Sequence, residues 1–224
     1  PQDLEIFRLE VDRAKQRELE QYSQLHQGVS PVSPVPASTA SKRPISMRRV
    51  ITFKQVENKR GVKARLVARG FEDPALRTGS LGVGACMAAR LSYLPVLLTA
   101  ATRGWEVVKM DISGAFLKGD RIARDVYLVP PPEARCASSQ VWKANMAVYG
   151  LVDAPFEFWR SLDKFLRAHS VWEDQLGWVI LNSPDDSCVY RILRTGRECV
   201  APVAVFPTHV DAFVFLGVLH KASP

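Results

Sequence analysis

The stretch PTHVDAFVFLG, residues 207–217, places a single aspartate between two apolar runs. The two runs contain Thr, Val and Phe, which favour strands, so the stretch predicts a buried hairpin with Asp211 at its tip. A carboxylate beside apolar strands is costly to bury unless it meets a cation or a metal. The next residue, Ala212, has no polar side chain. The stretch therefore raises the question of which partner Asp211 has.

A second aspartate stands in a similar setting. The run VVKMDISGAF, residues 107–116, predicts a buried strand that ends at Asp111. Two carboxylates at strand ends, together with a basic strand, suit a site for Mg²⁺ and a triphosphate, because hard oxygen ligands hold the metal while Lys or Arg binds the outer phosphate oxygens. Lone aspartates are also common in turns, so spacing alone leaves both interpretations open.

Positive charge is concentrated in one segment. The 224 residues include 30 Lys+Arg and 23 Asp+Glu, for a net charge of +7. Residues 42–69, here called the basic stripe, hold ten basic residues and one acidic residue. Lys63, Arg65 and Arg69 alternate with apolar residues on a predicted strand, so its polar face is positive. Such a stripe favours a polyanionic partner, and a solvated basic face is the alternative.

The composition excludes several classes of protein. Hydrophobic residues make up 47% of the chain, which is enough for a folded core. The four cysteines are scattered without the spacing of a zinc site or a disulfide framework, which favours a reduced compartment. The longest apolar run, residues 94–101, is too short to span a bilayer. We therefore expect an intracellular protein, cytoplasmic or nuclear. The chain begins with proline, which suggests a fragment.

Three regions follow one another along the chain. Residues 1–27 predict a charged helix, residues 28–46 a Pro/Ser-rich linker, and residues 47–224 the globular part. Residues 1 to about 44 are expected to contribute little to the core. Later segments alternate between predicted helices and strands, including a helix over about 86–102 that Pro95 should kink. The fold class predicted is α+β, with a mainly antiparallel sheet and packed helices.

Five segments occur in order and at intervals that resemble a known family. They read KARLVARGF (63–71), RGWEVVKMDISGAFLKGD (103–120), DVYLVPPP (125–132), VYGLVDAPFEFWRSLDKFL (148–166) and HVDAFVFLG (209–217). Together they resemble the reverse transcriptase of copia-type LTR retrotransposons, encoded within a Pol polyprotein. The resemblance implies a right-hand polymerase with fingers and palm, a two-metal Mg²⁺ site, deoxynucleoside triphosphates and an RNA or DNA primer-template as partners. The chain ends soon after the last segment, so the thumb is expected to be absent.

The resemblance assigns the acidic positions. Asp111 matches the first metal-binding aspartate, and the backbone of Ile112 matches the next metal-site position. Asp211 matches the first aspartate of the family's Tyr-x-Asp-Asp box. The second aspartate is replaced by Ala212 and the tyrosine by His209. The partner that the opening stretch lacks is therefore the second carboxylate of this box.

The resemblance also assigns a nucleotide pocket. Phe116 matches the aromatic residue that rejects a 2′-hydroxyl, and plain core packing is its alternative. Tyr149 and Gly150 match the segment that lines the pocket, and Tyr149 as a core aromatic is the alternative. Asp153 is interpreted as a helix cap rather than a catalyst. The residues matched to the strand that contacts the triphosphate are Lys63, Arg65 and Arg69, and the sequence does not decide which of them makes the contact.

Two functional interpretations remain from the sequence. One is an RNA-directed DNA polymerase fragment that is crippled by Ala212 and by truncation. The other is a non-catalytic transposon relic that retains only basic nucleic-acid binding. A third, a basic binding module unrelated to polymerases, requires Asp111 and Asp211 to lie far apart. Asp185 and Asp186 lie between Pro and Ser, which predicts a surface turn.

Overall fold

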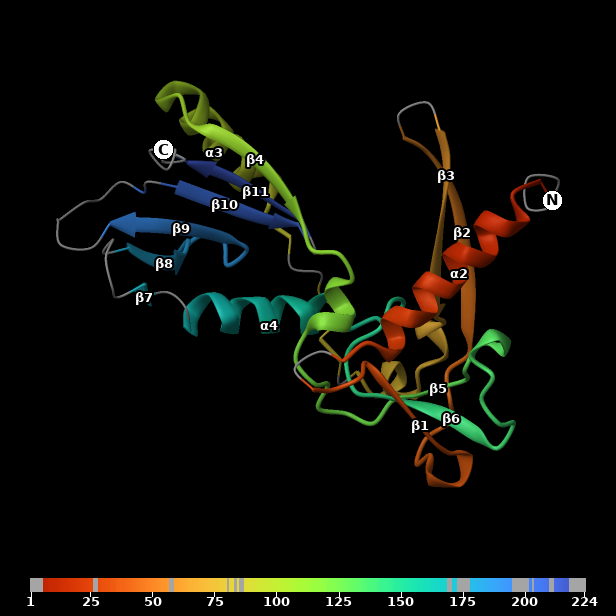
Figure 1. The fold of residues 1–224 in the computed structure, drawn as a ribbon. Helices are drawn as coiled ribbons and strands as arrows, with labels where there is room; N and C mark the ends of the chain where they lie inside the picture. The colour runs from red at the N-terminus through yellow and green to blue at the C-terminus, as the bar shows by residue number, and fades with distance from the viewer. Residues whose placement is uncertain are drawn as a thin grey trace. The chain divides into compact units, whose positions relative to one another are not determined.

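The computed structural model describes most of the chain in two compact units (Figure 1). One unit comprises Pro1–Val83 and Phe116–Phe158, and the other comprises Gly84–Ala115 and Trp159–Pro224. The described residues are 6–25, 28–56, 59–79, 81, 82, 84, 87–168, 171–172, 178–194, 202, 204–209 and 212–217.

A long two-stranded ribbon dominates the first unit. Strands β2 (Met47–Val56) and β3 (Lys59–Ala68) pair antiparallel along their whole length. Polar and apolar residues alternate over 63–66 in β3, which gives this strand two chemically different faces, whereas β2 shows no strict alternation. Helix α2 (Arg8–Ser23) packs against β3, and Figure 1 shows the helix crossing the ribbon. The two strands predicted from the basic stripe are confirmed.

A three-stranded sheet completes the first unit. Its order is β1 (Val32–Pro36), β6 (Gln140–Ala144), β5 (Tyr127–Leu128), and both pairings are antiparallel. β1 lies at the edge of the sheet, where its two prolines are tolerated because an edge strand needs only one side of its backbone for pairing. The linker predicted at 28–46 is thus partly a strand.

The expectation that residues 1–44 contribute little to the core is wrong. Tyr22 and Val32 are buried in the same apolar cluster as Leu66 and Trp142. The Tyr22 ring stacks on Trp142 with centroids 5.9 Å apart. The few apolar residues of α2 that face β3 suffice to bury one stripe of the helix, and its many charges occupy the rest of its surface.

Short 3₁₀ turns connect the elements of the chain. Asp73 starts one of them by accepting a hydrogen bond from the Ala75 amide at 3.0 Å. The turns are η1 (Ala37–Thr39), η2 (Gly70–Glu72), η3 (Pro74–Thr78), η4 (Ala115–Lys118) and η5 (Pro132–Ala134).

The second unit is built on a six-stranded antiparallel sheet. Its strands, in spatial order, are β4 (Glu106–Asp111), β11 (Ala212–Gly217), β10 (Ala204–His209), β9 (Val189–Arg194), β8 (Trp178–Asn182) and β7 (Val171–Trp172). The hairpin predicted at 207–217 is confirmed as β10 and β11, whose connecting residues 210 and 211 lie outside the described part. The mixture of helices with antiparallel sheet agrees with the predicted α+β class.

Two further helices accompany this sheet. Helix α3 (Arg90–Arg103) contains Pro95 and ends at Gly104, whose φ of 63° lies in the left-handed region that favours glycine. Helix α4 (Ala154–Ala168) starts in the first unit and continues into the second. Asp186 accepts a hydrogen bond from the Ala89 amide at 2.8 Å, just before α3 begins. The sequence predicted only a surface turn there, because this long-range bond leaves no local signal.

Candidate nucleic-acid interface and acidic corner

The two faces of the ribbon differ in chemistry. Residues that alternate along a strand share a face, and directly opposed residues of an antiparallel pair point to the same side. Leu66, Ala64 and Ala68 are buried on the side toward α2. The other face, here called the open face, carries basic residues from both strands; they are Arg48, Lys54, Lys63 and Arg65.

The three basic residues matched to the triphosphate contact differ in exposure and in their ion pairs. Lys63 is exposed and Arg65 is half-buried, and the two are adjacent on the open face. Arg69 follows the end of β3 and lies 3.7 Å from the Glu72 carboxylate. The hydrogen bonds that Glu72 accepts from the Ser46 amide and hydroxyl are the main reason that the pKa of Glu72 is lowered. Lys63 and Arg65 are therefore the better placed pair for a phosphate.

Three aromatic residues form a small cluster in the first unit. The ring of Phe116 meets Tyr149 at 5.1 Å and Phe158 at 6.1 Å between centroids, both in edge contacts. Phe158 is buried, whereas Phe116 and Tyr149 are half-buried and pack on the core. The structure thus brings together two of the predicted pocket residues. Phe158 was not predicted, although its place near the start of α4, three residues after Pro155, was visible in the sequence.

A tight turn joins this cluster to the ribbon. The Ala68 amide donates a hydrogen bond to the Tyr149 carbonyl at 2.7 Å. Gly150 has φ of 91°, and a Cβ at this position would collide with the Ala68 carbonyl and the Val67 side chain. Only glycine fits so close to β3 with this backbone conformation. Gly150 therefore fixes the approach of the turn to the strand.

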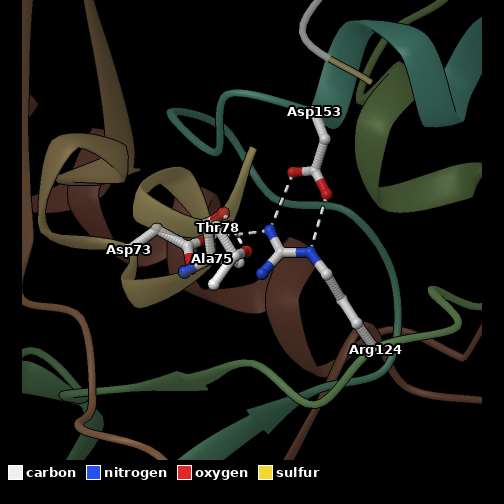
Figure 2. A network of polar contacts seen from close by, with 5 residues as sticks. All are labelled: Asp73, Ala75, Thr78, Arg124 and Asp153. Carbon is white, nitrogen blue, oxygen red and sulfur yellow. Dashed lines mark hydrogen bonds and ion pairs between the residues drawn. The ribbon is translucent and has the colours of Figure 1, made fainter. Parts of the chain in front are cut away.

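A buried ion-pair network lies beside this turn (Figure 2). Arg124 donates to both carboxylate oxygens of Asp153, at 2.7 and 2.9 Å, and lies 2.8 Å from an oxygen of Asp73. Both aspartates are buried. Burial acts to lower the pKa of Arg124, but the hydrogen bonds to Asp153 and Asp73 outweigh it and raise the pKa. Asp153 stands at the predicted cap position before α4, yet its carboxylate binds Arg124.

Of the two aspartates assigned to the metal site, the structure describes Asp111, which lies in the second unit; its surroundings are here called the acidic corner. Asp111 is the last residue of β4, its side chain is exposed, and its register partner in β11 is Ala212. Asp211 lies outside the described residues, so the closeness of Asp111 and Asp211 that a polymerase site requires stays a prediction. Ile112 follows Asp111 directly and is half-buried. His209 is exposed and is also paired with Ala212.

The described residues of this corner do not by themselves make a magnesium site. Mg²⁺ requires near-octahedral oxygen ligation. Asp111 supplies one carboxylate, and Ala212 opposite it supplies none. Within the part of the chain that the structure describes, no group of three or more His, Cys, Asp or Glu side chains is arranged to hold a metal.

A family model describes much of this chain. The model named "Reverse transcriptase (RNA-dependent DNA polymerase)" matches residues 34–181, which is more than half of the sequence. The chain belongs to the reverse transcriptase family. The match spans the ribbon, the aromatic cluster, the Arg124 network and Asp111, and it confirms the family that the five ordered segments predicted.

Curated relatives agree with this family. The chain is similar to "Retrovirus-related Pol polyprotein from transposon TNT 1-94" of Nicotiana tabacum, with 29% identity over 66% of this chain and 11% of the relative. It is also similar to the polyprotein of the same description from transposon RE1 of Arabidopsis thaliana, with 30% identity over 62% of this chain and 9% of the relative. The chain thus spans about a tenth of the length of these relatives.

The comparison with solved structures found no match for this chain. Its membership of the reverse transcriptase family therefore rests on sequence similarity. Within the described residues, no helix is both long and apolar enough to cross a bilayer.

Proposed function

We propose that this chain is the nucleic-acid-binding part of an RNA-directed DNA polymerase, with the ribbon as fingers and the six-stranded sheet as palm. The observation that carries this proposal is the open face of the ribbon. Arg48, Lys54, Lys63 and Arg65 lie on one face of a long hairpin, and the β3 residues Ala64, Leu66 and Ala68 on its other face are buried. A row of cations on an accessible strand surface is suited to successive phosphates of a polynucleotide or to a triphosphate.

In this proposal, Phe116 and Tyr149 form one wall of a nucleotide pocket. Their half-buried rings pack on the core on one side and keep the other side accessible. An aromatic face of this kind supports a base or sugar by stacking and contact. The Arg124 network holds the start of α4 beside the turn that carries Tyr149.

Nucleotidyl transfer itself is proposed to be lost or strongly reduced. By family, two Mg²⁺ ions on acidic residues would activate the primer hydroxyl and stabilise the leaving group. Asp111 and Asp211 are the residues assigned to hold them, and Ala212 replaces the third carboxylate. Phosphate binding by the open face does not depend on these carboxylates, so the proposal keeps it as the activity to test.

The test measures binding of a fluorescent primed template across a series of salt concentrations. Each basic residue that contacts a phosphate contributes to the slope of log affinity against log salt, so Lys63→Ala with Arg65→Ala should reduce the slope by about one for each residue. Arg8→Ala, an exposed residue of α2, is the control and should leave the slope unchanged. A slope that is the same in all variants would assign the basic stripe to solubility.

A further inference from the structure

Helix α2 makes an unusual contact with the outer edge of β3. In an antiparallel pair, every second residue of a strand points its N–H and C=O away from the partner strand. Leu66 is such a residue: its amide donates to the Glu18 carboxylate at 2.9 Å, and its carbonyl accepts from the Tyr22 hydroxyl at 2.6 Å. Glu18 and Tyr22 are four residues apart and so share one face of the helix. We call this set of contacts the Leu66 clasp.

The Leu66 clasp buries polar groups, and each of them needs a hydrogen-bond partner. Glu18 is 6% exposed, Tyr22 is 1% exposed and Leu66 is 1% exposed. A buried carboxylate and a buried hydroxyl are costly unless both are hydrogen-bonded, and here each finds its partner on the same residue. Displacing α2 would leave all four polar groups unpaired in the core, so the contact is specific to one placement of the helix against the strand.

The clasp also fixes the residues that the proposed function requires. Arg65 directly precedes Leu66 in β3 and points to the open face. The next outward-pointing position of the strand, Ala68, is bonded to Tyr149 at 2.7 Å. The outer edge of β3 is therefore held at two successive outward positions, one by α2 and one by the turn of the aromatic cluster.

We infer that Glu18 and Tyr22 are positioning residues for phosphate binding, acting through Leu66 to hold β3 so that Lys63 and Arg65 are presented together. This inference rests on the proposed function of the ribbon. Both residues lie before position 34, where the family match begins, so the match does not assign them a role. In this inference, helix α2 contributes to nucleic-acid binding by positioning β3.

The experiment is a double-mutant cycle on the full chain, with the same fluorescent primed template. Tyr22→Phe keeps the ring and removes the hydroxyl, and it should weaken binding by about threefold, the size expected for one net hydrogen bond. The same change in a Lys63→Ala/Arg65→Ala background should have no further effect, because the cations that it positions are gone. Equal loss in both backgrounds, or no loss in either, would overturn the inference.

A matched pair of variants tests the other half of the Leu66 clasp. Glu18→Ala should weaken binding as Tyr22→Phe does, and Glu18→Gln should restore it because the amide oxygen still accepts from Leu66. Glu20→Ala, an exposed neighbour on the same helix, is the control. Gln and Ala variants that bind equally would contradict the inference.

Different results would contradict the proposed function and the inference about the Leu66 clasp. A parent chain without salt-dependent binding would contradict the proposed function directly. Hydrogen exchange of the Leu66 amide then reports the Leu66 clasp alone: exchange should be faster in Glu18→Ala than in Glu18→Gln. Equal exchange in the two variants would show that the clasp does not hold the strand, whatever the ribbon binds.

Discussion

Glu18 is a buried carboxylate that accepts a hydrogen bond from the Leu66 amide and lies near basic residues. Burial raises its pKa, and the hydrogen bond from Leu66 together with the positive charges of Arg49, Arg65 and Lys63 offsets this only in part. The folded chain therefore takes up the proton of Glu18 more readily than the unfolded chain does. The contribution of this group to stability is fully present below the ordinary pKa of about 4.5 and is lost as the pH rises through the folded-state value.

Glu18→Gln should remove this pH dependence. Glutamine still accepts a hydrogen bond but carries no charge to desolvate. The variant should melt at a higher temperature than the parent at pH 7, and the difference should shrink as the pH falls towards about 4.5. Thermal denaturation across this range is the measurement, with the exposed Glu20→Gln as control. A gap that stays constant or widens towards acid would contradict the assigned direction of the pKa shift.

The Leu66 clasp also shows what a sequence does not reveal at the residue scale. Alternation in β3 predicted a basic face and a buried face, and both are present. Glu18 and Tyr22 looked like ordinary members of a charged helix, because their partners are backbone groups 48 and 44 residues away. Contacts between a side chain and a distant backbone leave no periodic signal.

Elements of the first unit are joined by the Arg124 network. Arg124 connects the start of η3, through Asp73, with the start of α4, through Asp153. Its guanidinium is mostly buried, with 19% of the side chain exposed. Removing the cation would leave two carboxylates buried beside each other without a counter-charge. Three segments that are distant in sequence thus depend on one side chain.

Arg124→Met should destabilise the first unit by about 3 kcal/mol, the range seen when one partner of a buried ion pair is removed. Chemical denaturation would measure this change. Arg121→Met, an exposed arginine of the same loop, is the control and should lie close to the parent. Combining Arg124→Met with Asp153→Asn should recover part of the loss. No recovery in the double variant would mean that the destabilisation does not come from the unpaired carboxylate.

Strand prediction succeeded where pattern and pairing agreed. β3 alternates over residues 63–66, and both β2 and β3 were predicted. β1 was assigned to a linker because its sequence VSPVP is poor in strand-forming residues, yet an edge position beside β6 accommodates its prolines. Tertiary pairing overrode local propensity there.

At the scale of the whole molecule, the residues predicted to bind the nucleotide and those predicted to bind the metal belong to different compact units. The ribbon and the aromatic cluster belong to one unit, and Asp111 with Ala212 belongs to the other. The sequence predicted the strands that carry Asp111 and Ala212, and their register places these two residues opposite each other. The prediction that the strand ending at Asp111 is buried is wrong, because β4 lies at the edge of its sheet and most of its residues are exposed. Their family role came from resemblance, since spacing of aspartates alone does not distinguish a metal site from turns.

The register between β4 and β11 makes Ala212→Asp a direct test of the acidic corner. Directly opposed residues share a face with Cβ atoms about 4.5–5.5 Å apart, so the new carboxylate would lie beside Asp111. Without metal, two like charges at this distance should lower the melting temperature. Mg²⁺ should reverse this loss because it binds the folded state and bridges the oxygens. The melting temperature should therefore rise with Mg²⁺ far more in Ala212→Asp than in the parent chain.

Two control variants separate metal binding from other causes of this rise. Ala212→Asn has almost the same shape but adds no charge, so it should show neither the loss without metal nor the recovery with it. Ala212→Asp combined with Asp111→Asn should also lose the recovery, since the metal needs both carboxylates. Zinc or calcium does not serve as a substitute probe, because their preferred ligands and distances differ from those of Mg²⁺. A Mg²⁺ response that is equal in Ala212→Asp and Ala212→Asn would show that position 212 is not where this chain lost its metal ligand.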